Sequence, residues 1–540
     1  MAGARGACAM KILVLSLLRL GDVILHRELA QSLKNEYPGA QIDFVIDDQF
    51  RAVKELIPEV SKWHQIPRLR WQKILVERKQ SPARAKFELQ KMVADIGAES
   101  YDLVLNATHS RFSARLMDLI SAKKKIGAQM INGKVGTASN RWQQYLNENF
   151  SGDGRSRFHY LELLHRSLEI SFTVPRRRNQ KKDSIYLQVL TSDEKKNWGL
   201  NRYFELFGRL RAQFPEKRIR VLCSPAEKKQ VQNFFSEEDI FCVDLLSLQK
   251  SLVKAELLIT GDTSVQHLAA QVGCRTLSLF LGSADPVKTA PWNQGARILS
   301  AQSPCFPCRH SDPCSQRSHL CAESIPVGEV LRSASRILLN LKEERHQEQE
   351  VKVQQRHFFI ENLENPELDA RVEQLAWSFY LSREPGVSFL PLASSAQDLM
   401  RDLGPHFVLS DFEQSYHRAQ EFQMGLEEMQ RRIRLLQQCV LQKDPKKAFQ
   451  AQRLLVRAGL QKLTLQVGPL SDSLARLNFA MTRSPQDHFI LLKELRAGLE
   501  QALELAHIRL QIFAHLQSLM KGGQDGRRVY ELNQEHSIET

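Results

Sequence analysis

Hydrophobic positions in the first 340 residues alternate between short continuous runs and longer amphipathic stretches. The continuous runs are typical of buried strands and lie at residues 11–15, 42–46, 103–106, 184–189, 219–223, 257–260 and 276–281. Apolar residues with helical spacing lie at 23–34 and 203–213. Because strands that alternate with helices build parallel sheets, we expect two similar α/β domains, residues 10–175 and 184–340, facing a cleft.

The chain after residue 340 has a different pattern. The polar segment KEERHQEQEVKVQQR is expected to be helical, and two apolar stripes with nearly heptad spacing follow it. The stripes are Phe412, Tyr416, Ala419, Phe422, Leu426, Met429, Ile433, Leu436 and Val440, and then Leu492, Leu495, Leu499, Leu503, Ala506, Leu510 and Phe513. We therefore expect an all-α helical bundle or coiled-coil extension over 341–520, used for self-association or for an unidentified protein partner, and a disordered tail over 521–540.

The charge balance narrows the classes of partner. The formal net charge of +14 favours anionic partners such as lipid head groups, phosphorylated sugars and nucleotides. No nucleic-acid-binding motif accompanies this charge, so a nucleic acid partner is not expected. No apolar run is long enough to predict a transmembrane helix. Several of the nine cysteines stand alone in apolar surroundings, which suits a reducing compartment and predicts a cytoplasmic protein.

Residues 62–91 form a basic segment that also contains a tryptophan. Its basic residues include Lys62, Arg68, Arg70, Lys73, Arg78, Lys79, Arg84 and Lys86. A run of this kind is most often a solvated face. The alternative is a surface that binds an anionic membrane.

The turn Gly261–Asp262–Thr263–Ser264 ends an apolar run and begins an alanine-rich helical stretch. Asp262 stands where a helix N-cap is expected, which is one interpretation of the turn. The other is an anion site, because the free N–H groups of a helix start would lie at the carboxyl end of a strand. The hydroxyls of Thr263 and Ser264 would then add hydrogen-bond donors that suit phosphate.

Three separated motifs share the pattern of a known family. They are KILVLSLLRLGDVILHRELAQSLKNEYPGAQIDFV at the N-terminus, LTSDEKKNW at 190–198, and the stretch that runs from LLITGDTSVQHLAAQ to ADPVKTAPW. Together, over about residues 10–340, they resemble glycosyltransferase family 9, the lipopolysaccharide heptosyltransferases. The resemblance implies a GT-B architecture, with the acceptor on the first Rossmann-like domain and the nucleotide-sugar on the second. It also implies inverting transfer of a heptose from an ADP-heptose-like donor to a lipopolysaccharide core sugar, without an essential metal.

The resemblance implies a role for each position of this chain that matches a functional position of the family. Asp22 falls on the family's catalytic base, and its alternative role is to cap the helix at 23–34. The residues that fall on donor-binding positions are Thr191, Ser192, Lys196, Glu227, Asp262, Thr263 and His267. Lys196 and the helix start at 262 would offset the charge of the departing diphosphate. Ser264 would line the diphosphate site, but the family usually has Gly there, which leaves the identity of the donor open.

The implied acceptor is a lipid-linked anionic oligosaccharide. We expect Arg111, Arg115 and Arg141, together with the basic segment 62–91, to face it at an anionic membrane surface. This would place the protein peripherally on the cytoplasmic face of the inner membrane.

Cys305, Cys308, Cys314 and Cys321 are spaced as C-x2-C-x5-C-x6-C. Four thiols in a cytosolic chain can hold a structural zinc ion, although this spacing is not that of a standard zinc finger. The alternative is ordinary thiols or a redox-labile pair.

Two further interpretations of the function stay open. One is a related transferase that uses another nucleotide-sugar and a different surface polysaccharide. The other is an inactive transferase fold that serves as a scaffold through its helical extension. The presence of Asp22, Lys196 and Asp262 favours an enzyme over the scaffold.

Overall fold

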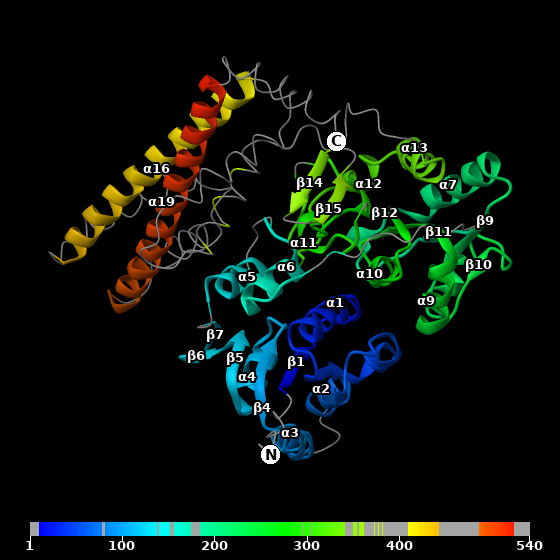
Figure 1. Ribbon diagram of the computed structural model, residues 1–540, viewed down its shortest axis with the longest axis horizontal. Helices are drawn as coiled ribbons and strands as arrows, with labels where there is room; N and C mark the ends of the chain where they lie inside the picture. Colours follow the sequence, from blue (N-terminus) through cyan, green and yellow to red (C-terminus); the bar gives the residue numbers. More distant parts are fainter. Residues whose placement is uncertain are drawn as a thin grey trace, which may run out of the picture. The chain divides into compact units, whose positions relative to one another are not determined.

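The computed structural model describes most of the chain in separate segments. These are residues 10–77, 82–137, 140–151, 156–172, 174, 184–294, 296–303, 305–310, 312–340, 349–353, 356–360, 372, 376, 378, 381, 409–441 and 485–522. The chain divides into two compact units, of which the first contains Met1–Phe150 and Phe158–Asn365 and the second contains Ser151–Arg157 and Pro366–Thr540. The strands of both expected α/β domains belong to the first unit (Figure 1).

The first sheet has five parallel strands in the order β3-β2-β1-β4-β5. They are β1 (Lys11–Ser16), β2 (Gln41–Asp47), β3 (Lys62–Ile66), β4 (Tyr101–Asn106) and β5 (Ala122–Gly127). The other elements of this half are α1 (Leu20–Glu36), η1 (Asp48–Leu56), α2 (Arg68–Glu77), α3 (Pro82–Gly97), α4 (Arg111–Leu119), β6 (Gln129–Ile131), β7 (Lys134–Gly136), α5 (Arg141–Ser151) and α6 (Tyr160–Leu168). The strand order reverses at β1, and open α/β sheets bind their ligands at the carboxyl ends of strands beside such a reversal.

The second sheet has eight strands in the order β10-β9-β8-β11-β12-β13-β15-β14, all parallel except β14. They are β8 (Ser184–Gln188), β9 (Arg218–Leu222), β10 (Ile240–Phe241), β11 (Ala255–Gly261), β12 (Arg275–Phe280), β13 (Ala296–Ser300), β14 (Gln349–Val353) and β15 (Arg356–Ile360). The helices are η2 (Glu194–Lys196), α7 (Leu200–Gln213), α8 (Lys228–Val231), α9 (Leu245–Lys254), α10 (Ser264–Gln271), α11 (Pro286–Thr289), α12 (Leu320–Glu323) and α13 (Val327–Leu338). Here the order reverses at β8, which lies between β9 and β11. The two parallel sheets with their helices confirm the expected α/β class.

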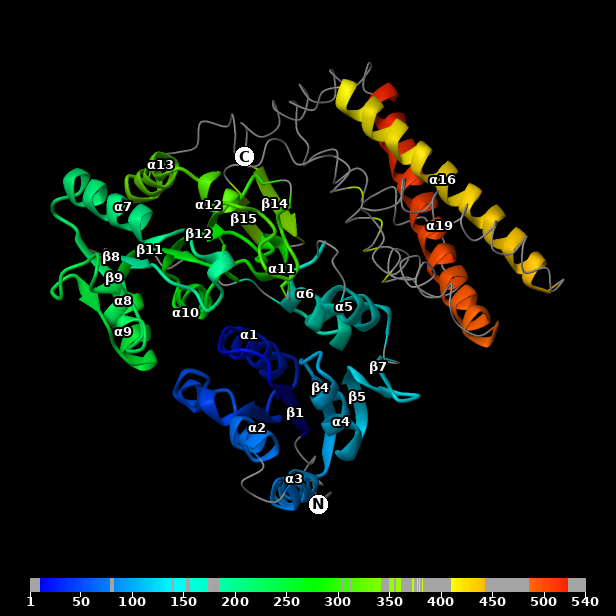
Figure 2. The ribbon, with the colours of Figure 1, turned by 180° about the vertical axis from the view of Figure 1, so that it is seen from behind.

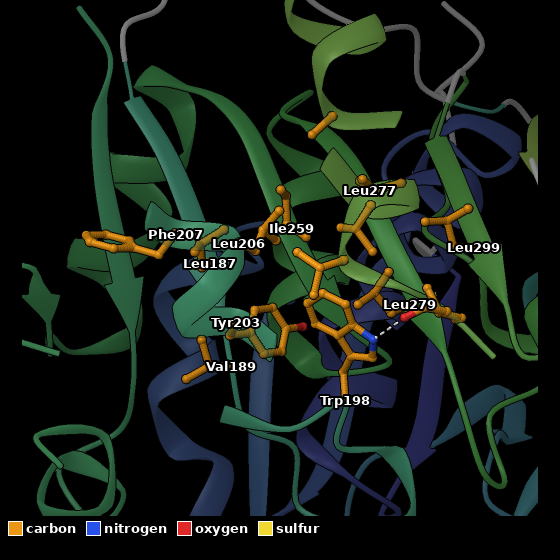
Figure 3. Close-up of a cluster of buried hydrophobic side chains, with 14 of the residues drawn as sticks. Leu187, Val189, Trp198, Tyr203, Leu206, Phe207, Ile259, Leu277, Leu279 and Leu299 are labelled. Atoms are coloured by element: carbon orange, nitrogen blue, oxygen red, sulfur yellow. Dashed lines mark hydrogen bonds between the residues drawn. The ribbon is translucent and has the colours of Figure 1, made fainter. Parts of the chain in front are cut away.

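The core of the second half explains why its strands are continuous apolar runs. Helices cover the sheet, so residues of both strand faces are buried, and Leu257, Leu258 and Ile259 of β11 are all fully buried. Trp198 packs beside Leu279 in this core, and its indole N–H donates to the carbonyl oxygen of Ile325 at 2.8 Å (Figure 3). This bond fixes the end of the loop that follows β8.

Helices α1 and α10 bring the two halves of the first unit together. They pack against each other, and both views of the molecule show them side by side (Figures 1 and 2). A Cβ on Gly21, at the start of α1, would lie 3.3 Å from Cδ2 of His267 and 3.5 Å from Cα of Ser264. The absence of a side chain at Gly21 therefore permits the close approach of the two helix starts.

Residues 349–353 and 356–360 differ from the helix expected for the polar segment after residue 340. Here β14 and β15 form an antiparallel pair, and β15 pairs in parallel with β13. Val351, Val353 and Phe358 have high strand propensity, and pairing with β13 satisfies backbone groups at a sheet edge, which outweighs the helical character of the surrounding polar residues. The helical expectation was therefore wrong for these strands.

The second unit contains two long helices, α16 (Leu409–Leu441) and α19 (Pro485–Gly522). Phe412 packs on Phe513 with ring centroids 5.6 Å apart, and Arg509 lies over the ring of Phe422, so the two helices run antiparallel. Residues 442–484 lie outside the described segments, so the bundle expected for 341–520 stays a prediction. The tail after residue 522 also lies outside them, so its expected disorder stays a prediction too. No helix within the described ranges is long and apolar enough to cross a membrane.

Candidate active site at the meeting of two strand ends

Asp22 lies in the first turn of α1, just beyond the carboxyl end of β1. The N-cap residue of α1 is Arg19, so Asp22 is not the N-cap of this helix. The backbone instead holds the carboxyl near the start of the helix, where the N–H group of Arg19 donates to it.

The surroundings of Asp22 suit a group that takes up and releases a proton near neutral pH. Burial raises its pKa to about 6, the positive charges of Arg19 and Lys288 oppose that rise, and the carboxylate of Asp262 adds to it. A general base works best with a pKa near the working pH, so Asp22 has the electrostatic character that base catalysis needs.

Lys196 and Asp262 form a buried ion pair at the carboxyl edge of the second sheet. The Lys196 Nζ atom lies 2.7 Å from Asp262 Oδ2, and the two side chains are only 9% and 11% exposed. Burial opposes ionisation of Asp262, but the ammonium of Lys196 holds its pKa below the usual value. Gln266 and Thr289 donate to Asp262 Oδ1 at 2.7 Å and 3.3 Å. These contacts fix the carboxylate in place.

The start of α10 differs from the expected cap. Thr263 is the N-cap residue and its side chain makes no capping hydrogen bond, so the interpretation of Asp262 as the N-cap is wrong. The hydroxyl of Thr263 lies 3.1 Å from that of Thr260, and Ser264 is the first helical residue. The carboxylate of Asp262 leaves the capping position because the buried ammonium of Lys196 is the stronger partner.

His267 lies one turn into α10 and faces the start of α1 through its contact with Gly21. Burial lowers the pKa of His267 to about 4, so its ring is neutral at neutral pH. Its Nδ1 atom is buried and has no hydrogen-bond partner within the described part of the chain. Asp22, Asp262 and His267 thus meet from two elements that are far apart in the sequence.

The loop after β8 carries the other expected donor-binding residues. The Thr191 hydroxyl donates to the backbone carbonyl of Asp193 at 2.7 Å, and Ser192 is exposed. Lys195 Nζ donates to the carbonyl oxygens of Arg309, His310 and Asp312 at 2.9, 2.9 and 2.5 Å. The loop is therefore tied to the cysteine-bearing segment that follows β13.

Glu227 lies beyond β9, the strand next to β8, and is partly buried. Its Oε2 atom accepts hydrogen bonds from the backbone N–H of Ser224 at 2.7 Å and from the Ser224 hydroxyl at 2.8 Å. The side chain is thus at the same edge of the sheet as Asp262. Its expected contact with a nucleoside stays a prediction.

The expected acceptor-binding arginines lie on two helices of the first half. Arg111 and Arg115 are exposed one turn apart on α4, and Arg141 begins α5. The charges that act on Asp22 come from Arg19, Asp262 and Lys288 instead. A role of the three arginines toward an acceptor stays a prediction.

Several charges of the basic segment 62–91 are neutralised by neighbouring acids. Lys62 pairs with Glu99 at 3.0 Å and Arg68 with Asp47 at 2.7 Å, and Arg70 and Arg84 both pair with Glu88. Part of this segment is therefore the ordinary ion-paired face that a charge run most often forms.

The four cysteines do not form the expected zinc site. Within the described segments, no group of three or more His, Cys, Asp or Glu side chains has an arrangement that could hold a metal ion. Cys314 is exposed, while Cys321 is buried and its Sγ atom lies 3.2 Å from the Ser303 hydroxyl. The structure therefore does not gather the four thiols into a metal site, and a structural zinc ion at these cysteines stays a prediction.

Sequence reasoning missed several residues that complete the site. Arg19 stands three positions before Asp22 in the first motif, and Lys288 lies within the stretch ADPVKTAPW of the third. A charged residue inside each motif could therefore have indicated them. No sequence feature indicated Tyr160, because it comes from α6, which lies outside the three motifs. Its hydroxyl donates to the Ala107 carbonyl at 2.5 Å and lies 2.8 Å from Nε2 of His26.

The hydroxyl of Tyr160 settles the proton positions of His26. Since that hydroxyl donates to a carbonyl, it must accept from His26 Nε2–H. The other nitrogen, Nδ1, then accepts from the Ser16 hydroxyl at 2.7 Å. Burial lowers the pKa of His26 to about 3, which agrees with a neutral ring that ties the end of β1 to Tyr160 of α6.

Comparison with known proteins supplies an independent assignment. Residues 89–318 match the model of glycosyltransferase family 9 (heptosyltransferase). The chain is 25% identical over 316 residues to lipopolysaccharide heptosyltransferase 1 of Pseudomonas aeruginosa, which covers 55% of this chain and 86% of that protein. It is 27% identical over 95 residues to lipooligosaccharide heptosyltransferase 2 of Campylobacter jejuni, which covers 17% of this chain and 29% of that protein.

Solved structures were also compared with the chain. E. coli heptosyltransferase WaaC with ADP matches with 17% identity and a TM-score of 0.44, over 61% of this chain and 100% of that one. A glycosyltransferase family 9 protein from Veillonella parvula matches with 17% identity and a TM-score of 0.45, over 63% and 100%. The assignment rests on the family match and on the sequence relatives: residues 89–318 match glycosyltransferase family 9, and the protein is a glycosyltransferase.

Proposed function

We propose that the protein is an inverting glycosyltransferase of GT-B architecture. It moves a heptose, or a related sugar, from an ADP-activated donor to the core sugar of a lipid-linked anionic acceptor. The observation that carries the proposal is the meeting of Asp22, from the end of β1, with the Lys196–Asp262 ion pair, from the ends of β8 and β11. A base on one half and a cation on the other are the two groups that such a transfer needs.

The chemistry assigns a separate task to each side chain. The carboxylate of Asp22 takes the proton of the acceptor hydroxyl as its oxygen forms a bond to the anomeric carbon. The bond from that carbon to the donor phosphate breaks, and its electron pair goes to the diphosphate. Attack from the face opposite the leaving group inverts the anomeric configuration.

Lys196 and the start of α10 act on the leaving group. The ammonium of Lys196 and the N–H groups at the start of α10 offset the charge that develops on the diphosphate. Ser192 and Ser264 would supply neutral hydrogen-bond donors to its oxygens, and Glu227 would accept from the nucleoside. Thr191 and Thr263 would donate to the diphosphate once their hydroxyls turn from Asp193 and Thr260. The relatives that match this chain are named for heptosyl transfer to lipopolysaccharide or lipooligosaccharide, which supports heptose as the transferred sugar.

Ser264 favours a second candidate, a transferase that uses a different nucleotide-sugar. Its Cα lies close to Gly21 at the meeting of the two helix starts, so its side chain occupies space beside the proposed diphosphate site. A donor with a different sugar or base would make different contacts with the side chain of Ser264. An inactive scaffold is the least favoured candidate, because a buried ion pair and a carboxyl with a raised pKa cost stability without serving a scaffold.

We also propose that the protein acts at the cytoplasmic face of the inner membrane, where a lipid-linked acceptor would lie. Exposed Leu69, Val76 and Phe87 accompany the basic residues of α2 and α3, and this combination suits an anionic lipid surface. Arg111 and Arg115 would add charge on the same half.

A donor panel tests the proposal directly. Release of nucleoside diphosphate would be measured with ADP-heptose, ADP-glucose, UDP-N-acetylglucosamine and GDP-mannose, each with a heptose-free lipid-linked core oligosaccharide. Acceptor-dependent release from ADP-heptose alone supports heptosyl transfer. Release from another donor alone supports the second candidate, and release from none of them contradicts the proposed reaction.

A further inference from the structure

His310 makes a contact with the half of the molecule to which it does not belong. It lies in the segment 305–310, which follows β13 of the second sheet, and its side chain is 56% exposed. Its Nε2 atom accepts a hydrogen bond from the guanidinium of Arg19, the N-cap residue of α1 in the first half. The two residues are 291 positions apart in the sequence, so this bond forms only when the two halves meet.

The proton positions of His310 follow from its partners. A guanidinium has only N–H donors, so Nε2 of His310 is the unprotonated nitrogen and Nδ1 carries the proton. The Nδ1 atom faces its own half, where it lies 3.3 Å from the hydroxyl of Ser283 and 3.5 Å from Oδ2 of Asp193. The Ser283 hydroxyl donates to the same Oδ2 atom at 3.3 Å. The neutral ring therefore has a separate partner on each half.

The loop after β8 holds His310 in place. Lys195 Nζ donates to the backbone carbonyl of His310 at 2.9 Å. Asp193 caps η2, because its Oδ1 atom accepts from the N–H of Lys195 at 3.1 Å. The helix η2 also contains Lys196, whose N–H donates to the Asp193 carbonyl at 2.9 Å. The loop that carries the proposed leaving-group cation thus also orients the ring of His310.

Arg19, at the other end of the contact, belongs to the helix start that carries the proposed base. Asp22 is the third residue of α1, and its carboxyl accepts from the backbone N–H of Arg19, as in the returning half of a capping box. The Arg19 carbonyl accepts from the N–H of Val23 at 3.1 Å. The backbone of Arg19 is therefore fixed beside Asp22 by the first turn of α1.

The guanidinium of Arg19 depends on His310 for its position. Within the described part of the chain, the bond to His310 is the only one that this exposed guanidinium makes. An exposed arginine without a partner samples many rotamers, so this bond is what fixes its charge. Burial raises the pKa of Asp22, and the charge of Arg19 is the largest effect that opposes the rise.

We propose that His310 is a positioning residue for the base, because it holds the Arg19 side chain at the start of α1 when the two halves meet. This rests on the proposed function, since it assigns one more residue to the same site. His310 touches neither sugar and exchanges no proton during transfer. Its contact makes the ionisation of Asp22 depend on the docking of the second half, so the base is ready only beside the loop that carries Lys196.

Several titratable and charged groups surround the two ends of this contact. Those that face Asp22 are Arg19, Tyr160, Asp262, His267 and Lys288. Those that face His310 are Arg19, Asp193, Lys195 and Lys196. Burial and the charge of Arg19 lower the pKa of His310, which favours the neutral ring that the contact requires. Arg19 is common to both sets, so a change at His310 reaches the base through Arg19.

Two substitutions in the full chain separate the two nitrogens of His310. The amide of glutamine can place its oxygen near the position of Nε2, and the amide of asparagine can place its nitrogen near that of Nδ1. His310→Gln therefore keeps the acceptor for Arg19, whereas His310→Asn keeps a donor to the second half and loses Arg19. Because His310 is exposed, both variants should fold. Arg19→Met removes the charge itself.

His319→Asn is the matched control. His319 follows in the same stretch between β13 and α12, and its Nε2 atom lies 2.9 Å from the backbone carbonyl oxygen of Lys195. It therefore contacts the same loop after β8 as His310 does, but from a position that does not include Arg19. The measurements for all variants are the pH profile of kcat/KM and the ADP affinity by calorimetry.

His310→Asn and Arg19→Met should move the acid limb of kcat/KM to higher pH by about half a unit to one unit, because the base loses a fixed positive neighbour. Below the limb, kcat/KM then falls about three- to tenfold, and well above the limb it matches the wild type. His310→Gln and His319→Asn should keep the wild-type limb. The double variant Arg19→Met/His310→Asn should shift no further than Arg19→Met, since both changes remove one contact. ADP affinity should stay unchanged in the His310 variants.

An unmoved acid limb in His310→Asn would overturn this inference, and so would an equal shift in His310→Gln and His310→Asn. Neither result affects the proposed function. A wild-type protein that transfers no sugar from any donor of the panel would overturn the proposed reaction instead. An acid limb that persists unchanged in Asp22→Asn would overturn the role of Asp22 as the base, and this inference with it.

Discussion

Lys196 Nζ lies 2.7 Å from Asp262 Oδ2, and this pair joins the loop after β8 to the turn after β11. Both side chains are nearly buried, so neither charge can be satisfied by water if the other is removed. The pair therefore has a structural role as well as its proposed catalytic one.

The substitution Asp262→Asn should lower the free energy of unfolding by about 3 kcal/mol, because it leaves the ammonium of Lys196 buried without a counter-charge. Urea denaturation measures this loss. The double variant Lys196→Met/Asp262→Asn is the control, and it should recover much of the stability because both charges are gone. A single variant that loses less than about 1 kcal/mol would show that the pair is well solvated.

The substitution Asp22→Asn should stabilise the protein at pH 7. The pKa of Asp22 is raised to about 6 from its ordinary value of 3.8, so the ionised carboxylate costs stability above pH 6 and the cost fades as pH falls toward 4. At pH 7 the gain is at most about 3 kcal/mol, since each pKa unit corresponds to about 1.4 kcal/mol. Thermal unfolding at pH 7 and pH 4 measures the gain, which should disappear at pH 4. Equal stability at pH 7 would contradict burial of the charge.

Truncation tests where the catalytic body ends. A chain cut after Asn365 keeps β14 and β15 and should bind ADP with the affinity of the full chain. A chain cut after Asn340 loses both strands and leaves the edge of β13 unpaired, which favours association of exposed edges. Calorimetry and light scattering distinguish the two. If the chain cut after Asn340 is monodisperse and binds ADP as the full chain does, β14 and β15 are dispensable for the catalytic body.

Vesicle co-sedimentation tests the proposed membrane surface. The protein should bind anionic vesicles in a salt-sensitive way, since each basic group near such a surface contributes about 1 kcal/mol. The double variant Arg111→Glu/Arg115→Glu should reduce binding. Arg209→Glu is the control, because Arg209 is an exposed residue of α7 in the other half. Equal binding to neutral vesicles would count against an electrostatic surface.

The sequence predicted the parts of the site that depend on local pattern. Asp22, Lys196 and Asp262 each follow a short apolar run, and the carboxyl ends of parallel strands gather at one edge of a sheet. Their residue types and the family resemblance then pointed to a base at Asp22 and to donor-binding groups at Lys196 and Asp262. The motif resemblance agreed with the later family match over residues 89–318.

The remaining features depend on contacts between distant segments. Lys288 lowers the pKa of Asp22 although the two residues come from distant segments, and no local pattern encodes that effect. The interpretation of Asp262 as a cap stayed open because the pattern does not show that Lys196 approaches it from 66 residues away. The strands β14 and β15 form because β13 offers β15 a sheet edge.

The central claim is that Asp22 takes the acceptor proton while Lys196 acts on the diphosphate. Transfer rate and ADP affinity, measured together for Asp22→Asn and Lys196→Ala, test it most directly. Asp22→Asn should keep ADP affinity nearly unchanged and lower turnover by roughly 10²–10⁴, the usual contribution of a positioned base. Lys196→Ala should weaken ADP binding by about 1.5–3 kcal/mol and also lower turnover. Transfer by Asp22→Asn at the wild-type rate would contradict the account.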